Sequence, residues 1–235
     1  MQERRVVNDS GLATFFGKVY ATMGVGLLIT AAVSYLLGSV FATDYGNFIV
    51  AHRFMFWIAT FLPFILVLLM NSQRGRENAG YARLMFGLLA VTFGFTFGTL
   101  WLVYPAANMA IALVVTAVVF FSMTAVGRIT KQNLSQAGRI AYGALFGVIL
   151  LSVINWFMGS TGLAFLLSYA ILIIFIVMTA ADTQALKNIY MSAGGNGGYV
   201  VNTSSLAVQG ALILYLDFIN LFVVILQIFG VSDRN

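Results

Sequence analysis

Seven long apolar stretches constrain the fold of this chain more strongly than any other feature of its sequence. A helix needs about 20 largely apolar residues to cross the hydrocarbon core of a bilayer. Stretches of roughly this length cover residues 15–41, 54–70, 81–103, 106–126, 140–158, 162–186 and 206–229. The second is short, so we expect its helix to begin near Asn47 or to extend past Asn71. The sequence therefore predicts an all-α integral membrane protein with seven transmembrane helices.

The composition supports this assignment and argues against several classes of protein. Of the 235 residues, 61% are apolar and 8% are charged, whereas a soluble domain has about 45–50% apolar and about 25% charged residues. The chain has no cysteine and a single histidine, His52, which argues against disulfides and against zinc, haem or iron–sulfur sites. We therefore expect no cofactor. The basic residues are scattered among helix ends, so we expect no nucleic-acid partner.

Lysine and arginine residues are distributed unevenly between the two sides of the predicted membrane. With the N-terminus inside, only Arg53 and Arg234 fall on the outer side, and ten fall on the inner side: Arg4, Arg5, Lys18, Arg74, Arg76, Arg83, Arg128, Lys131, Arg139 and Lys187. Because cytoplasmic loops are enriched in basic residues, we expect an inside N-terminus and an outside C-terminus. The predicted parts are a cytoplasmic N-terminal segment (1–14), a single seven-helix transmembrane domain (15–230) and a short C-terminal tail (231–235).

Glycines indicate close helix packing at some positions and a loop at another. Two glycines four residues apart on one helix let a neighbouring helix approach closely. Two such pairs occur, Gly94 with Gly98 and Gly143 with Gly147, and we expect both to pack within the bundle. The longest inner connection, 187–205, holds a glycine cluster at 194–198 and is predicted to contain a flexible loop. Alternatively the sixth helix continues to Ser192, because no helix-breaking residue precedes the glycines.

The last two predicted helices each carry one narrow polar stripe. Projected at 100° per residue, the polar residues of the last helix fall within an arc of about 80°; they are Gln209, Asp217, Asn220 and Gln227. Those of the sixth helix fall within about 100°; they are Ser168, Thr179, Asp182 and Thr183. A charged residue at the bilayer centre costs about 2.5–3.5 kcal/mol on insertion scales. Two carboxylates in such positions therefore predict a cation or proton site.

Asp182 and Asp217 are expected to lie at one depth in the membrane. If the sixth helix runs to Ser192, Asp182 lies about 15 Å from its end and Asp217 about 16 Å from Leu206, at a rise of 1.5 Å per residue. Two carboxylates close together in a low dielectric tend to share one proton. When deprotonated they form an oxygen-rich site suited to a hard cation such as Ca²⁺, to which Asn220 could add an oxygen. The alternative is that each aspartate only hydrogen-bonds within the bundle.

Two short segments resemble the signatures of one membrane protein family. The segment ILYLDFINLF at 213–222 resembles the last-helix signature of the Bax inhibitor-1 family, also called the transmembrane Bax inhibitor motif family. Asp182-Thr183-Gln184 resembles the helix-six motif of that family. The resemblance implies six helices around a central C-terminal helix, and a pH-sensitive dyad formed by Asp182 and Asp217. It also implies that an arginine at the inner end of helix two, matched here by Arg74 or by the nearby Arg76, latches onto the helix-six aspartate.

The resemblance implies a function as well. Bacterial members similar to this chain act as pH-dependent calcium leak channels, and eukaryotic relatives suppress cell death and lower calcium stores. The short C-terminus lacks the basic tail of eukaryotic members, which favours a multi-pass protein of the bacterial cytoplasmic (inner) membrane. The chain departs from the family pattern in having Ala181 where an aromatic residue often stands, and Pro63 about where some bacterial members have an acid.

We therefore expect a monomer in the lipid bilayer that passes Ca²⁺ and responds to H⁺. One alternative is a non-transporting regulator that binds other membrane proteins, such as a membrane protease or a stress or cell-death partner. An intramembrane aspartyl protease also uses two aspartates, but the chain lacks its Gly-x-Gly-Asp and Pro-Ala-Leu elements, so we expect no enzyme. A proton-coupled transporter would show an inverted repeat or broken half-helices, and neither is evident.

Overall fold

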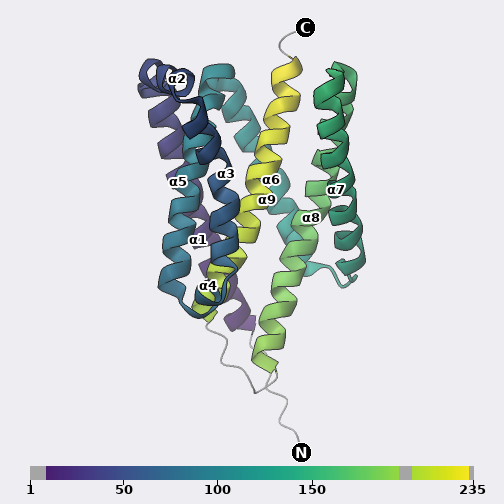
Figure 1. The fold of residues 1–235 in the computed structure, drawn as a ribbon. Helices are drawn as coiled ribbons and strands as arrows, with labels where there is room; N and C mark the ends of the chain where they lie inside the picture. Colours follow the sequence, from purple (N-terminus) through teal and green to yellow (C-terminus); the bar gives the residue numbers. More distant parts are fainter. Residues whose placement is uncertain (1–8, 196–202, 233–235) are drawn as a thin grey trace, which may run out of the picture. The chain divides into compact units, whose positions relative to one another are not determined.

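The computed structural model describes residues 9–195 and 203–232, and within these ranges every regular element is helical (Figure 1). The elements are α1 (Asp9–Tyr35), a π-helical turn η1 (Leu36–Val40), α2 (Ala42–Ala51), α3 (Arg53–Met70), α4 (Gln73–Glu77), α5 (Ala79–Val103), α6 (Ala106–Ile129), α7 (Ser135–Met158), α8 (Thr161–Gly195) and α9 (Thr203–Ser232). Seven stretches are long and apolar enough to cross a membrane: α1 with η1, α3, α5, α6, α7, α8 and α9. The predicted all-α membrane protein with seven spanning helices is confirmed.

Several helices extend beyond the apolar stretches that predicted them. The longer alternative for the sixth helix is correct, because α8 continues past Leu186 to Gly195. The expectation of a long connection at 187–205 is wrong, since α8 and α9 take up all of it except 196–202, which lies outside the described residues. Most of the predicted glycine loop lies there too. Backbone hydrogen bonds carry a helix into polar sequence, so the end of the apolar run does not end the helix.

The second spanning helix differs from its prediction at both ends. It neither begins near Asn47 nor extends past Asn71, because α3 runs from Arg53 to Met70. His52 has φ −121° and ψ 51°, which separates α3 from the short helix α2. Tyr45 holds α2 in place: its ring is buried and its hydroxyl donates to the carbonyl oxygen of Phe95 on α5. Burial raises the pKa of Tyr45 to about 12.

The chain divides into two compact units. Unit 1 comprises Met1–Pro105 and Tyr190–Tyr215, and unit 2 comprises Ala106–Ile189 and Leu216–Asn235. In unit 1, α5 packs against α1 and α3. The predicted seven-helix domain of 15–230 stays a prediction as a single domain, because α8 and α9 contribute residues to both units.

A buried hydrogen-bond chain joins three helices of unit 1. The Thr30 hydroxyl on α1 donates to the carbonyl oxygen of Ala90 on α5 (2.9 Å), and so accepts from the hydroxyl of Tyr215 on α9 (2.7 Å). Near the start of α9, the buried Ser205 hydroxyl donates to the carbonyl oxygen of Gly75 on α4 (2.7 Å). These bonds fix the first half of α9 against α1, α4 and α5.

Only one of the two glycine pairs packs as predicted. A Cβ at Gly94 would lie 2.7 Å from the Cβ of Val33 on α1, and a Cβ at Gly98 would lie 2.9 Å from the Tyr45 ring. The expectation is wrong for Gly143 and Gly147 on α7, which have nothing within 4 Å of such a Cβ. A pair of glycines four residues apart therefore marks a close contact with neighbouring residues on α5 but not on α7.

The last helix is the most buried of the seven spans. Within its most apolar window, 56% of α9 is buried, against 33% or less for each other span. This burial fits an interior position, and the ring of six helices around it stays a prediction.

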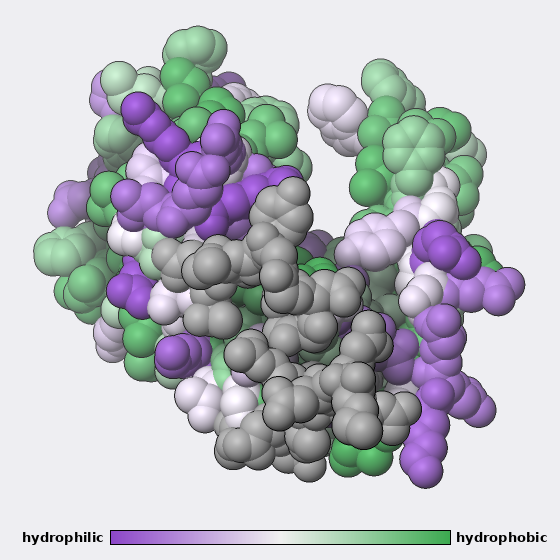
Figure 2. Space-filling view, turned by 90° about the horizontal axis from the view of Figure 1, so that it is seen from below, coloured by the Kyte–Doolittle hydropathy of each residue, from purple (hydrophilic) through white to green (hydrophobic). Residues whose placement is uncertain are grey.

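Seen from below, hydrophilic side chains gather over α4 in unit 1 and, separately, over the connection between α6 and α7 in unit 2 (Figure 2). Arg74 and Arg76 lie on α4 itself, whereas Arg53 begins α3 at its opposite end. This distribution agrees with the charge bias of the sequence. An inside N-terminus and outside C-terminus stay a prediction, because a bilayer is needed to orient them.

The glycine contacts predict opposite effects of one substitution at two sites. We expect Gly94→Ala to destabilise the protein by about 1–3 kcal/mol, because its methyl group would overlap Val33. Gly143→Ala is expected to stabilise it by about 0.5–1 kcal/mol, because alanine loses less conformational freedom than glycine in a helix. Denaturant unfolding in mixed detergent micelles measures both, and equal effects at the two positions would contradict the packing described.

Candidate ion site in the membrane-spanning helices

Asp217 is the most deeply buried acid among the described residues. It lies on the unit 2 part of α9 and exposes 3% of its surface. The next residue, Phe218, packs edge-to-face on Phe120 of α6, with ring centroids 5.4 Å apart. The Oδ2 atom of Asp217 is buried and has no hydrogen-bond partner among the described residues. An unpartnered carboxylate oxygen in an apolar environment requires a proton or a cation.

Asp182 lies on α8 and has a hydrogen-bond donor on α7. It exposes 9% of its surface. The hydroxyl of Tyr142 lies 3.0 Å from Oδ1 and 2.8 Å from Oδ2, and donates to this carboxylate. A hydroxyl that donates to a carboxylate stabilises its ionised form.

Small residues explain how Tyr142 reaches Asp182. A Cβ at Gly138, one turn before Tyr142 on α7, would lie 3.0 Å from the Cβ of Ala181 on α8. The two helices therefore approach closely at this level. Long side chains on a helix lean toward its N-terminus, so Tyr142 reaches back toward the level of Gly138. The departure from the family pattern at Ala181 coincides with this contact, where a larger side chain would push α7 away.

A second glycine brings α6 against the same part of α8. A Cβ at Gly127 would overlap the carbonyl oxygen of Ala180 and lie 2.9 Å from the Cβ of Thr183. Asp182 therefore lies on a stretch of α8 that is packed against α6 on one side and α7 on the other. Such packing restricts the rotation of α8 and fixes the direction of the carboxylate.

The two aspartates share a unit and act on each other. Asp182 interacts electrostatically with Asp217, and both act on the Tyr142 hydroxyl. Asp182 lies thirteen residues before the end of α8 at Gly195, and Asp217 fourteen residues after the start of α9 at Thr203. Consecutive spans run in opposite directions, so both acids lie about 20 Å along their helices from that end. The observed helix ends therefore leave the prediction of equal depth unchanged, and it stays a prediction.

Four buried threonines lie on α6 and α8, in the same unit as the acids. Each donates its hydroxyl proton to a carbonyl of its own helix, over 2.6–3.1 Å, and keeps its oxygen as an acceptor; they are Thr116, Thr124, Thr179 and Thr183. Thr179 and Thr183 flank Asp182 on α8 and are fully buried. The interior of this unit therefore offers oxygen acceptors as well as carboxylates.

The other residues of the predicted polar stripes lie in varied surroundings. Asn220 and Gln209 are half-buried and Gln227 is exposed. Gln209 belongs to unit 1, whereas Asn220 lies in unit 2 with Asp217. Ser168 on α8 is half-buried, and its hydroxyl donates to the carbonyl oxygen of Ala164 (3.1 Å). The role of Asn220 as a cation ligand stays a prediction.

Among the described residues, no group of three or more His, Cys, Asp or Glu side chains gathers that could hold a metal ion. The two aspartates supply acidic oxygens for a cation. Further ligands would come from hydroxyl, amide or backbone oxygens, or from water.

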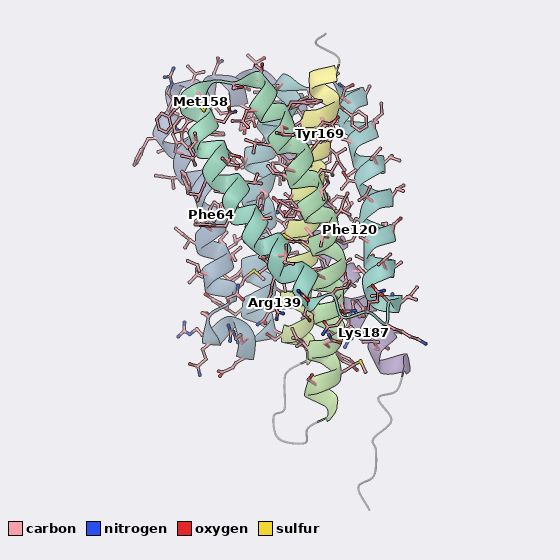
Figure 3. The ribbon with its side chains drawn as sticks, turned by 90° about the vertical axis from the view of Figure 1, so that its right-hand side faces the viewer. Phe64, Phe120, Arg139, Met158, Tyr169 and Lys187 are labelled. Atoms are coloured by element: carbon pink, nitrogen blue, oxygen red, sulfur yellow. The ribbon has the colours of Figure 1, made fainter. Side chains whose placement is uncertain are left out.

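The basic residues of unit 2 include Arg128 in the last turn of α6, Lys131 in the connection to α7 and Arg139 near the start of α7. Figure 3 shows Arg139 on α7 and Lys187 on α8 near one end of their helices, and Met158 and Tyr169 near the other. Arg74, the predicted latch for Asp182, is exposed on α4 in unit 1, as is Arg76. The latch stays a prediction for either arginine, and within unit 2 the bonded partner of Asp182 is Tyr142.

Sequence reasoning missed Tyr142 and gave no role to the threonines of α6. Tyr142 stands in a stretch that reads as uniformly membrane-spanning, and it is half-exposed. Its position one turn after Gly138 is a possible signal, but that signal becomes informative only once α8 is known to be the partner of α7.

Comparisons with known proteins give one family. The chain matches the model of the family described as "Inhibitor of apoptosis-promoting Bax1" over residues 12–234. It is 35% identical over 221 residues to the inner membrane protein YbhL of Escherichia coli strain K12, covering 94% of this chain and 93% of YbhL. It is 33% identical over 238 residues to YrjE of Lactococcus lactis, covering 100% and 99%. It is 34% identical over 226 residues to the membrane protein SpyM3_0260 of Streptococcus pyogenes, covering 96% of each.

The Tyr142–Asp182 bond predicts an energetic coupling between the two side chains. In a double-mutant cycle with Tyr142→Phe and Asp182→Asn, we expect a coupling of about 1–2 kcal/mol, because the acceptor is a carboxylate. Denaturant unfolding in mixed micelles measures it. The matched control pairs Tyr142→Phe with Asp44→Asn, an exposed acid on α2, and should be additive. Additivity in both cycles would show that the bond contributes nothing.

Proposed function

The chain belongs to the Bax inhibitor-1 family of membrane proteins, and on this premise we propose that it is a pH-sensitive calcium (cation) leak channel. In this proposal Asp182 and Asp217 form an intramembrane dyad that binds either a proton or the passing cation. The observation that carries the proposal is that two interacting acids are buried in membrane-spanning helices, and one of them has an oxygen without a partner among the described residues. Acids in such positions mark ion or proton pathways.

The dyad would respond to pH because its two carboxyl groups cannot both ionise cheaply. In the protonated state one proton is shared, and the pair carries a single negative charge. In the deprotonated state the pair carries two negative charges and attracts a divalent cation. The Tyr142 hydroxyl stabilises the ionised form of Asp182, so the proton would reside mainly on Asp217, whose Oδ2 has no other partner among the described residues.

Ca²⁺ suits this site as a passing ion. Ca²⁺ takes six to eight oxygen ligands in flexible geometry, and two aspartates alone give an incomplete set. Threonine oxygens, Asn220 and water would supply the rest. A leak requires binding that is favourable enough to admit the ion and weak enough to release it, and a site with two acids meets this condition better than a cage of three or more.

Arg74 would connect the dyad to gating. An ion pair between Arg74 and Asp182 would hold the closed state, and protonation of the dyad would change the charge that the arginine meets. A change of charge at such a pair biases a helix arrangement with two states. Arg76 is the alternative for this role.

The proposed location is the cytoplasmic (inner) membrane of a bacterium, with the N-terminus inside. Support comes from the name of the relative YbhL, an inner membrane protein of Escherichia coli, and from the charge bias of the loops. The protein would act there as a monomer, without a cofactor and without enzymatic activity.

A second candidate is a non-transporting regulator that binds other membrane proteins. The description of the matching family, an inhibitor of apoptosis-promoting Bax1, favours it. In that case the buried acids would serve a conformational role, and the candidate partners would be a membrane protease or a stress or cell-death protein.

Calcium flux into proteoliposomes tests the main proposal. We expect wild-type protein to pass Ca²⁺ at a rate that changes with pH across the physiological range. Asp182→Asn and Asp217→Asn should each flatten this pH profile across the physiological range, because the remaining carboxyl group loses its like-charged neighbour and no longer shares a proton with it. A dye sealed inside the vesicles reports the flux.

Asp44→Asn provides the control, because it removes an exposed acid with the same chemistry. Its pH profile should match that of wild type. If both intramembrane variants keep the wild-type profile, the dyad mechanism is wrong. If wild-type protein passes no Ca²⁺ at any pH and captures a membrane protein instead, the regulator is the better assignment.

The latch gives a separate prediction for Arg74. We expect Arg74→Gln to raise the Ca²⁺ flux about fivefold at the pH where wild-type flux is lower, because an ion pair worth about 1 kcal/mol shifts a two-state equilibrium by this factor. Arg76→Gln, two residues away on the same short helix, should leave the flux unchanged. The reverse result would assign the latch to Arg76, and no effect of either would remove it.

A further inference from the structure

Two side chains of α8 hold both ends of the connection between α6 and α7. This connection comprises residues 130–134, between the end of α6 at Ile129 and the start of α7 at Ser135. The Lys187 ammonium donates to the carbonyl oxygen of Arg128 in the last turn of α6 (2.8 Å). That turn leaves its carbonyl oxygens without helical partners, so Lys187 satisfies one of them.

Gln184 makes the more specific contact, with two hydrogen bonds in opposite senses. Its Oε1 accepts from the backbone N–H of Leu134 (2.7 Å), and its Nε2 donates to the carbonyl oxygen of Gln132 (2.8 Å). Gln184 is buried, with 8% of its surface exposed. An amide side chain offers an acceptor and a donor on two separate atoms, and it does so at neutral pH without titrating.

Leu134 is the N-cap residue of α7, directly before Ser135, and its side chain makes no capping hydrogen bond. Its carbonyl oxygen accepts from Gly138 (2.8 Å), so the first turn of α7 starts from its position. Gln184 therefore fixes the starting point of α7 from outside that helix. Projected at 100° per residue, Gln184 falls between Ala181, which contacts α7, and Ala180, which contacts α6.

The register of α7 decides whether Tyr142 meets Asp182. Gly138 and Tyr142 lie one and two turns after Leu134 on the same side of α7. A shift of α7 by one residue would move Tyr142 by 1.5 Å along the helix axis and rotate it by 100°, which would remove it from hydrogen-bond distance. Tyr142 and Gln184 thus act on one carboxylate, the first directly and the second through the start of α7.

We infer that Gln184 is a positioning residue: it clamps the connection 130–134 onto α8 and so holds Tyr142 in register against Asp182. The clamp itself is a property of unit 2, and its effect on ion flux rests on the function proposed above. The charged residues next to Gln184 or next to its bonded partners are Asp182 and Lys187 on its own helix, Arg128 on α6 and Lys131 in the connection. None of them replaces its two bonds.

The test measures the Tyr142–Asp182 coupling in the full-length protein with and without the clamp. The coupling is measured by the double-mutant cycle of Tyr142→Phe and Asp182→Asn. We expect Gln184→Ala to reduce it to less than roughly half its wild-type value. Hydrogen exchange of the Leu134 amide should become on the order of fivefold to tenfold faster, because its acceptor is gone. Gln132→Ala is the matched control, since it removes a glutamine side chain from the same connection and keeps the backbone carbonyl oxygen.

Gln184→Glu provides a second variant of the same size. Its carboxylate keeps the acceptor for Leu134 but, when ionised, lacks the donor for Gln132. We expect its coupling to fall between those of wild type and Gln184→Ala, which keeps the proposal testable if the alanine variant fails to fold.

The outcomes separate the clamp from the proposed channel. Coupling that is unchanged in both Gln184 variants overturns the clamp, whatever the flux does. Coupling that falls, together with a pH profile of Ca²⁺ flux altered as in Tyr142→Phe, supports both proposals. Coupling that falls while wild-type vesicles show no flux supports the clamp and removes the channel.

Discussion

A carboxylate inside a membrane-spanning helix has few ways to be stable, and this constraint organises unit 2. It must accept hydrogen bonds, hold a proton or meet a cation, because the surrounding hydrocarbon offers no water. Asp182 accepts from Tyr142, whereas Asp217 keeps one oxygen without a partner among the described residues. The two acids thus have different hydrogen-bond surroundings, and in the proposed dyad this difference would favour Asp217 as the residue that holds the proton.

The hydrogen bond to Asp182 depends on packing rather than on the tyrosine alone. Gly138 and Gly127 let α7 and α6 approach α8 on either side of the acid. Gln184 and Lys187 then tie the connection between those helices to the same α8. The glycine contacts, the end of α6 bonded by Lys187 and the Asp182 carboxylate therefore lie in one packed region of about two helical turns. A regulator or a channel would use such a region in the same way, by converting a change of charge into a change of helix position.

Unit 1 has a different character, because the buried hydrogen bonds that hold its helices together join hydroxyl groups and backbone oxygens. Thr30, Tyr215 and Ser205 fix the first half of α9, and Tyr45 fixes α2 against α5. Tyr215 lies two residues before Asp217 on one continuous helix. The helix that carries Asp217 is thus anchored within unit 1 by Tyr215, which is fully buried.

The sequence by itself determined the class of fold, the seven spans and the two acids, because apolar length and the rarity of charge in a bilayer are local properties of the chain. It also predicted an equal depth for Asp182 and Asp217, which follows from counting residues along α8 and α9. The tertiary structure alone decided which side chain bonds Asp182, which glycine pair packs and what holds the start of α7. Those contacts join residues about 40 to 60 positions apart, and helical periodicity specifies the face a residue occupies but not the helix that it meets.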